Sequence, residues 1–158
     1  GRPRRLTSEE WQRLVITLPQ PTLDIAILAI ETALRRSELL AIHHEHIDRD
    51  RHWLTVPVTK NGVPRVVPLT ERALSVLNCH PSKERLFAIA PDSVTQAFGR
   101  ACQRAGINDL RFHDLRHEAI SRLFEQGRSV PEVASISGHS DYRMLARYTH
   151  LQPASRIE

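Results

Sequence analysis

The sequence predicts an α+β fold, a mainly helical single domain with a small antiparallel β-sheet or hairpin. Its 158 residues suit one domain with its own hydrophobic core. Helix signals recur along most of the chain, such as hydroxyl residues followed by carboxylates and glycines after apolar runs. One stretch differs, because two β-prone runs flank Asn61 and Gly62, and Asn-Gly is the strongest short signal for a hairpin.

Three helices are expected ahead of that hairpin. Thr7 offers a hydroxyl N-cap with carboxylates in the next turn, which predicts a helix over residues 8–17. A second helix starts near Thr22 and is apolar nearly all round, so it should be buried. A short third helix is expected over residues 36–42.

The β segment is expected to form two short strands, over residues 52–56 and 63–69. Three prolines cannot donate ladder hydrogen bonds, which predicts short, edge-like strands: Pro57, Pro64 and Pro68. Beyond the strands the sequence predicts helical stretches, over residues 70–77, 92–106, 113–126, 131–138 and 142–148.

Composition limits the class of protein. Hydrophobic residues make up 41% and charged residues 25%, as in globular domains. The longest apolar run, residues 25–30, is far shorter than the ~18 residues that span a bilayer, and no signal peptide is recognisable. We therefore expect a cytoplasmic protein with no membrane partner. Cys79 and Cys102 lie outside any CxxC pair, so we expect two reduced thiols, no metal site and no cofactor.

The positive charge is almost entirely arginine. Lysine and arginine number 22 against 18 acidic residues, a net charge of +4, and the only lysines are Lys60 and Lys83. The planar guanidinium fork binds phosphate at two points. An arginine bias is equally expected from a GC-rich genome, so charge alone does not identify nucleic acid as the partner.

Four separated segments carry groups suited to phosphoryl transfer, and each has an ordinary explanation when taken singly. Arg35 and Glu38 stand three residues apart, the spacing of a surface ion pair on a helix. A lysine beside an Asn-Gly turn is usually solvated, and a lone tyrosine is usually packed. The segments are residues 32–39, 59–62, 113–117, and 137–140 with 147–150.

Taken together, the order and spacing of these segments resemble the tyrosine recombinase (phage integrase) family. That family shows Thr-Gly-x-Arg-x-x-Glu-Leu, a hairpin lysine, His-x-x-Arg, Leu-Gly-His-Ser, and a tyrosine nine residues after that histidine. Here Arg35 opens the series, and Tyr148 follows His139 by the same nine residues. The resemblance covers residues 6–150, nearly the whole chain. It implies a catalytic core that cleaves and rejoins DNA strands through a 3′-phosphotyrosine without a metal.

The resemblance also implies a role for each matching residue. Tyr148 would be the nucleophile, and Arg35, Arg116 and His139 would stabilise charge on the phosphate oxygens. Because a phenol has an ordinary pKa of about 10, it needs help at neutral pH, and nearby guanidiniums would favour the phenolate.

Two proton transfers would complete the reaction. His113 would accept the proton of Tyr148, since histidine titrates near neutrality. Lys60 would donate a proton to the leaving 5′-oxygen, and Glu38 would support an arginine.

The chain departs from the family pattern at Ala33, where glycine is usual, and at Ser137, where leucine is usual. We assign residues 1–158 to the catalytic domain; residues 1–6 resemble the linker after an N-terminal DNA-binding domain, which would be absent. The resemblance implies double-stranded DNA as partner and a homo-oligomer, a tetramer, on it. It also leaves room for accessory DNA-bending proteins.

Other classes stay open. A metal hydrolase would use His113 and His117, four residues apart on a helix, but helical zinc sites with that spacing usually carry glutamate where Asp114 stands. A catalytically inactive DNA-binding relative would not need a tyrosine at a fixed distance after Gly-His. A type IB topoisomerase-like strand cutter uses similar chemistry, and only strand exchange between sites separates it from a recombinase.

Overall fold

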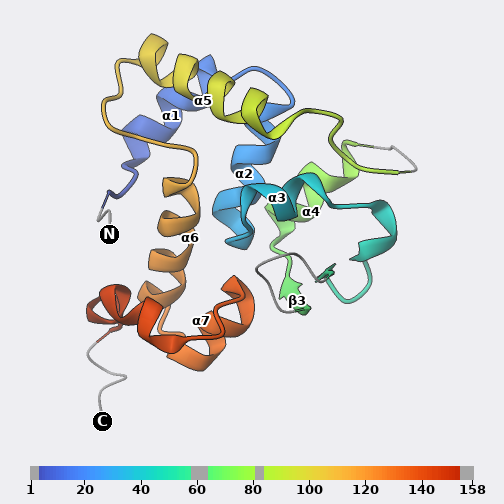
Figure 1. The fold of residues 1–158 in the computed structure, drawn as a ribbon, viewed down its shortest axis with the longest axis vertical. Helices are drawn as coiled ribbons and strands as arrows, with labels where there is room; N and C mark the ends of the chain where they lie inside the picture. Colours follow the sequence, from blue (N-terminus) through green and yellow to red (C-terminus); the bar gives the residue numbers. More distant parts are fainter. Residues whose placement is uncertain (1–3, 58–63, 81–83, 154–158) are drawn as a thin grey trace.

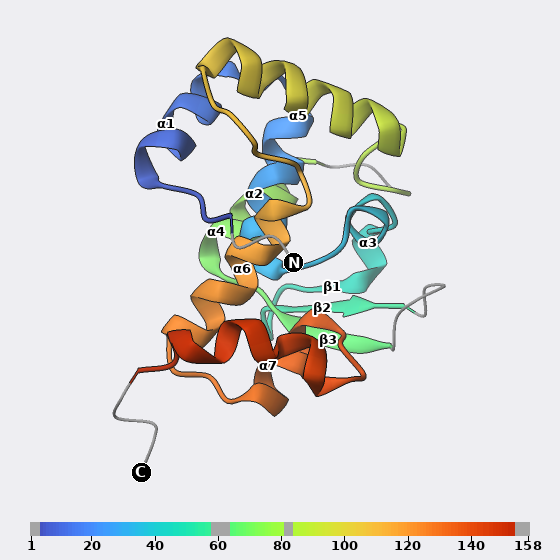
Figure 2. The ribbon, with the colours of Figure 1, turned by 60° about the vertical axis from the view of Figure 1, so that its left-hand side comes forward.

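The computed structural model describes residues 4–57, 64–80 and 84–153. Figures 1 and 2 show α1 (Ser8–Thr17) and α5 (Pro91–Ala105) side by side at one end. From there α6 (Asp114–Glu125) runs to the other end, where it meets α7 (Val130–Ser137) and the last helix, η2 (Tyr142–Leu151). Within the described residues, no helix is both long enough and apolar enough to cross a membrane.

The helix α2 (Thr22–Thr32) forms the centre of the core. It packs against α4 (Glu71–Asn78) and α6, and also against α5 and α3 (Arg36–Leu40). Ile25 and Leu28 have no exposed surface. The prediction of a buried second helix is confirmed, and burial of its apolar side chains stabilises the domain.

The small sheet has three antiparallel strands in the order β1-β2-β3, with bounds Ile47–Asp48, Trp53–Val56 and Arg65–Pro68. The strand β2 is central, so the expectation that both hairpin strands are edge-like is wrong for β2. Its second partner, β1, has two residues, too few for an alternating pattern that the sequence could display. The predicted Asn-Gly turn lies outside the described residues.

The remaining helices occupy the predicted places, with ends that differ by a few residues. The helix α7 begins with a capping box between Ser129 and Glu132 and ends at Gly138, whose φ of +80° is in the left-handed region. The short 3₁₀ helix η1 (His44–His46) was not predicted, and η2 is a 3₁₀ helix that extends to Leu151.

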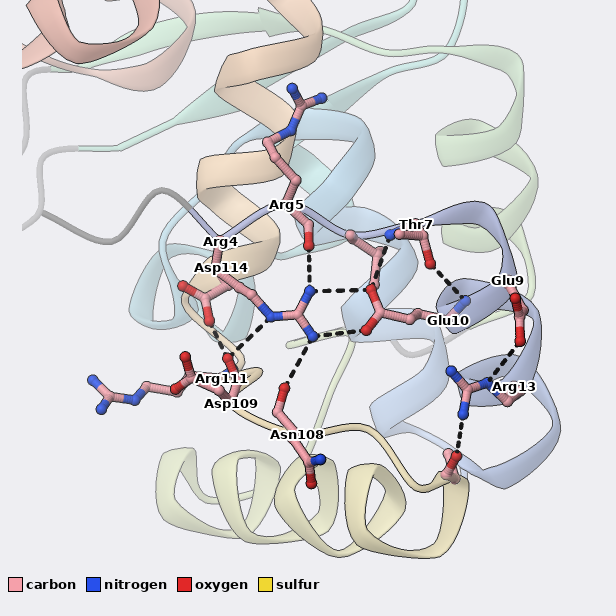
Figure 3. A network of polar contacts seen from close by, with 12 residues as sticks. Arg4, Arg5, Thr7, Glu9, Glu10, Arg13, Asn108, Asp109, Arg111 and Asp114 are labelled. Atoms are coloured by element: carbon pink, nitrogen blue, oxygen red, sulfur yellow. Dashed lines mark hydrogen bonds and ion pairs between the residues drawn. The ribbon is translucent and has the colours of Figure 1, made fainter.

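Arg4 binds the start of the chain to the body of the domain (Figure 3). Its guanidinium donates to both carboxylate oxygens of Glu10, at 3.1 and 2.7 Å, and to the carbonyls of Asn108 and Asp109, at 3.0 and 3.2 Å. It therefore connects α1 with the segment between α5 and α6.

The next two residues bind α6. Arg5 donates to both oxygens of Glu118, at 2.9 and 3.2 Å, and to Glu125 at 2.8 Å. The backbone N–H of Leu6 donates to Glu118 Oε1 at 2.9 Å. The buried Glu118 carboxylate thus has charged and backbone donors together, so Arg5 and Leu6 are fixed on the helix that also carries Arg116.

Candidate active site

Arg35 and Glu38 lie at the start of α3. Arg35 is the N-cap, and its backbone N–H donates to Glu38 Oε1 at 2.9 Å, while Arg35 Nη1 lies 3.6 Å from Glu38 Oε2. Glu38 is only 2% exposed. The pair is therefore not the surface ion pair that spacing alone would suggest, and the Arg35 side chain stays partly exposed beside a buried carboxylate.

Glu38 is charged although it is buried. Burial raises the pKa of the carboxyl, but hydrogen bonds from Arg65 and the Arg35 backbone outweigh it, so the pKa is lowered overall. Arg65 donates to Glu38 Oε2 at 2.6 Å and to Oε1 at 2.9 Å. Arg65 was not among the residues singled out in the sequence.

Arg116 is buried in the first turn of α6, 4% exposed. Its Nη1 donates to the carbonyl of Ala33, the residue with φ of +61° that ends α2. None of the described residues accepts a hydrogen bond from the buried Nη2. Burial, and then the charge of Arg35, lower the pKa of Arg116 to about 9. A bound anion would satisfy the free donor and offset both effects.

Tyr148 lies in η2 with its ring buried and its hydroxyl on a histidine. Tyr148 is 6% exposed, and its ring stacks on Phe124, with centroids 6.2 Å apart and an interplanar angle of 11°. The hydroxyl is hydrogen bonded to Nδ1 of His117. Burial raises the pKa of the phenol above its ordinary value, and the opposing charges of Arg147 and Arg116 do not reverse this. The guanidiniums of Arg147 and Arg116 therefore favour the phenolate, as expected, but burial of the phenol outweighs them.

His117 and His113 stand edge to face on α6, with ring centroids 4.9 Å apart. Burial, and then the neighbouring His113, lower the pKa of His117 to about 4. Burial and Arg116 lower the pKa of His113. Neutral His117 can accept at Nδ1 from the protonated phenol, so the structure places His117, and not His113, on the hydroxyl of Tyr148.

His139 follows the end of α7. Its Nδ1 lies 2.6 Å from the hydroxyl oxygen of Ser137, which has no exposed surface. Burial, followed by the charges of Arg116 and Arg35, lowers the pKa of His139 to about 4. When the Ser137 hydroxyl donates to Nδ1, the proton of the neutral ring is on Nε2, where it is available to a ligand.

The structure brings the predicted site residues of three segments into one electrostatic cluster. The positive charge of Arg35 lowers the pKa of Arg116 and of His139, and the positive charge of Arg116 opposes the rise in the pKa of Tyr148. A hollow of about 510 Å³ opens between α3, α5 and the start of α6, and Arg35, His113 and Arg116 line part of it. Lys60 lies outside the described residues.

Three residues of the site were missed as site residues: Arg65, His117 and Ser137. A signal was present for two of them. Ser137 departs from the family pattern, and His117 follows His113 by one helical turn on the same face. Among the described residues no group of three or more His, Cys, Asp or Glu side chains is placed to hold a metal ion.

The free energy of unfolding should fall as the pH drops from about 6.5 to about 4. His117 and His139 have a pKa of about 4 in the folded protein, against an ordinary 6.5. Within that interval the unfolded chain binds protons that the folded chain excludes, so acid favours unfolding, whereas above pH ~6.5 these two residues add no slope. Urea unfolding at pH 7.5, 5.5 and 4.5 measures the effect. The double variant His117→Gln with His139→Gln should show a flatter profile; equal slopes in both proteins would contradict the burial of neutral histidines.

Solved structures share this fold. The catalytic domain of bacteriophage HP1 integrase superposes with a TM-score of 0.76 at 26% identity, over 95% of this chain and 89% of that one. XerA recombinase superposes with a TM-score of 0.80 at 21% identity, over 99% of this chain and 63% of that one. The fold is therefore that of tyrosine recombinase catalytic domains.

The chain belongs to the phage integrase family, whose sequence profile matches residues 4–155. It is 46% identical over 158 residues to the shufflon-specific DNA recombinase of Escherichia coli, a match that covers 96% of this chain and 41% of that protein. The chain spans about half the length, or less, of the curated relatives it matches first.

Proposed function

We propose that this chain is the catalytic domain of a site-specific DNA recombinase that cleaves and rejoins strands through a 3′-phosphotyrosine at Tyr148. The observation that carries the proposal is the position of the buried Tyr148, whose hydroxyl is hydrogen bonded to His117 and whose pKa is affected by the charge of Arg116. Arg116 in turn has a buried N–H donor that no described residue uses. Membership of the phage integrase family and the likeness to a DNA recombinase support the same reaction.

Arg35, Arg116 and His139 form the phosphate site of this proposal. A phosphodiester carries one negative charge, which spreads over the non-bridging oxygens during displacement, so catalysis depends largely on positioned donors and positive charge. Arg116 offers a donor that no described residue uses, and Arg35 is partly exposed beside it. His139 adds a neutral N–H, which donates without adding to the repulsion between two guanidiniums.

The proton of the nucleophile passes to His117. The Tyr148 oxygen forms a bond to phosphorus as the bond from phosphorus to the 5′-oxygen breaks, and the phenol proton moves to Nδ1 of His117. The low pKa of His117 in the free protein makes it a weak base there. A phosphate bound at Arg116 brings a negative charge that favours the protonated imidazole.

The 5′-oxygen takes its proton from Lys60, which stays a proposal from the sequence because it lies outside the described residues. Resealing reverses the steps: a 5′-hydroxyl attacks the phosphotyrosine and gives its proton to Lys60, and the bond from phosphorus to the Tyr148 oxygen breaks as His117 returns its proton to that oxygen. The residues of the chain carry the charge neutralisation without a metal or cofactor.

The proposal for the whole protein is broader. The partner of the whole protein is double-stranded DNA, on which it acts as a homo-oligomer, a tetramer, with an N-terminal DNA-binding domain ahead of the linker-like residues 1–6 and accessory DNA-bending proteins in some reactions. It acts in the cytoplasm of a bacterial cell, on a mobile element or phage genome. A catalytically inactive relative and a type IB topoisomerase-like strand cutter are the alternatives.

The covalent intermediate tests the function directly. Supercoiled plasmid is incubated with the full-length protein and a chelator, and adducts that resist SDS are separated and mapped by mass spectrometry. An adduct on Tyr148 that forms with chelator present supports the proposal, and exchange of strands between two sites separates a recombinase from a topoisomerase. Absence of any adduct from the full-length protein favours the inactive relative.

Glutamine variants separate the two histidines as acceptors of the phenol proton. Glutamine keeps a hydrogen bond but cannot take a proton at neutral pH, and loss of general base catalysis typically slows a reaction about 10²–10⁴-fold. We expect His117→Gln to slow adduct formation by about 10²-fold or more, and His113→Gln to slow it less. Single-turnover cleavage of a duplex with the mapped site measures both rates. The opposite order would assign the proton transfer to His113, as the sequence motif suggests.

A further inference from the structure

Arg65 occupies an inward position of the edge strand β3. It pairs with Val56 of β2, and Val67, two residues further along β3, has no exposed surface. Alternation along a strand therefore points the Arg65 side chain to the core face, and 6% of that side chain is exposed. An arginine at such a position needs partners for every donor it buries.

Each nitrogen of the Arg65 guanidinium has an acceptor. Its Nη1 and Nη2 donate to the two oxygens of Glu38, at 2.6 and 2.9 Å, and its Nε donates to the carbonyl of Ile136 at 2.7 Å. Glu38 lies in α3, and Ile136 lies in the last turn of α7. The Arg65 side chain thus connects α3 with α7. The proposed phosphate ligands, Arg35 and His139, lie at the start of α3 and just after the end of α7.

The turn after α7 lies directly against this guanidinium. A Cβ at Gly138 would lie 2.7 Å from Arg65 Nη1 and 2.8 Å from Cζ. The φ of +80° at Gly138 also disfavours any other residue. The glycine before His139 is therefore required by its contact with Arg65 as well as by its backbone conformation.

Arg35 and His139, the two proposed phosphate ligands, are both connected to the Arg65 guanidinium through other residues. Glu38, held by Arg65, accepts from the Arg35 backbone at 2.9 Å and lies 3.6 Å from Arg35 Nη1. On the other side, Arg35 Nη1 donates to the carbonyl of Ser137 at 3.4 Å, and Ser137 contacts His139. The side chains of Arg65, Glu38 and Arg35 and the backbone at the end of α7 thus form a closed path, in which Arg65 makes the shorter hydrogen bonds between α3 and α7.

We propose that Arg65 is a positioning residue that holds Arg35 and His139 at the separation that the scissile phosphate requires. The proposal rests on the proposed function, because it assigns Arg65 to the same phosphate site. Arg65 reaches the phosphate only through Glu38 and the backbone at the end of α7. Misplacement of catalytic groups by about 1 Å costs on the order of 10²-fold in rate, so a small change at Arg65 should be visible.

The substitution Arg65→Lys tests this positioning role most directly. Lysine keeps a positive charge for Glu38 but lacks both the two-point contact with Glu38 and the separate Nε–H that donates to the carbonyl of Ile136. We expect single-turnover cleavage to slow by about 10–10²-fold, with DNA affinity and melting temperature close to those of the wild type. Arg4→Lys is the matched control, since the Arg4 guanidinium also makes a two-point contact with a glutamate, Glu10 (Figure 3), but its hydrogen-bond acceptors lie in residues 5–10 and 108–109 and not in α3 or α7. The cleavage rate of Arg4→Lys should stay within about twofold of wild type.

A second substrate distinguishes positioning from general loss of structure. Replacing one non-bridging oxygen of the scissile phosphate with methyl removes its negative charge, so the reaction depends less on a well-placed Arg35. The defect of Arg65→Lys should therefore shrink on the methylphosphonate duplex. Equal defects on both substrates, or a rate within twofold of wild type on the phosphodiester, would overturn the assignment.

The double variant Glu38→Met with Arg65→Met covers the case in which lysine is not tolerated. Replacing a buried ion pair with apolar groups of similar size is often neutral for stability. We expect this protein to fold and to cleave at least about 10-fold more slowly than wild type. A folded double variant with wild-type cleavage would reject the positioning role. Absence of a Tyr148 adduct in the wild type would instead reject the proposed function, so the two failures are distinguishable.

Discussion

Replacing Tyr148 with phenylalanine is expected to abolish the covalent protein–DNA adduct while the fold and DNA binding stay close to wild type. The variant removes one hydroxyl and keeps the ring stacked on Phe124. His117 loses its hydrogen-bond donor at Nδ1, which should lower the free energy of unfolding by about 1–3 kcal/mol at most. Adduct formation on SDS gels and a DNA-binding titration at fixed salt measure the two properties separately.

The chain contains a matched control for this variant. Its second tyrosine, Tyr142, lies at the start of the same helix, 51% exposed. Tyr142→Phe should retain adduct formation near the wild-type rate. An adduct formed by Tyr148→Phe, or its loss in Tyr142→Phe alone, would contradict the assignment of the nucleophile.

Replacing Arg116 with methionine is expected to slow adduct formation by about 10²–10³-fold, or roughly 3–4 kcal/mol of transition-state stabilisation, because a preorganised donor to the phosphate is lost. Stability should change little. The variant loses the hydrogen bond to Ala33, but it also removes a charge whose pKa is lowered by burial and whose Nη2 has no partner among the described residues.

Arg122→Met on the same helix serves as the control. Arg122 is partly exposed and donates to Glu118, which also keeps its hydrogen bonds from Arg5 and Leu6. Its cleavage rate should stay within a few-fold of wild type. Similar losses in both variants would mean that positive charge along α6, and not a specific phosphate donor, controls the reaction. Single-turnover rates and urea unfolding of the two variants provide the comparison.

The elements with a regular pattern could be predicted from the sequence. The helix cap at Thr7, Pro131 in the first turn of α7 and the apolar length of α2 are local signals, and the structure confirms the helices they indicate. The strand β1 could not be predicted, because its two residues acquire their conformation by pairing with β2. Nor did the sequence show that η2 is a 3₁₀ helix.

The candidate site was also only partly predictable from the sequence. Fixed spacings identified Arg35, Arg116, His139 and Tyr148, but the spacings carry no information about which side chains touch. The contact between Arg65 and Glu38 joins positions 27 residues apart, and that between His117 and Tyr148 joins positions 31 residues apart. The raised pKa of the Tyr148 phenol likewise depends on burial by segments that are distant in the sequence.

The anchoring of Arg4 and Arg5 also determines where this domain can be joined to another in a chimeric protein. A junction placed after Arg5 would leave the buried carboxylate of Glu118 on α6 with fewer hydrogen-bond donors. It would also remove the Arg4 guanidinium that donates to Glu10. A junction upstream of Arg4 keeps both contacts inside the transplanted unit. Exchange of the proposed N-terminal DNA-binding domain should therefore succeed most often when the crossover point precedes these two arginines.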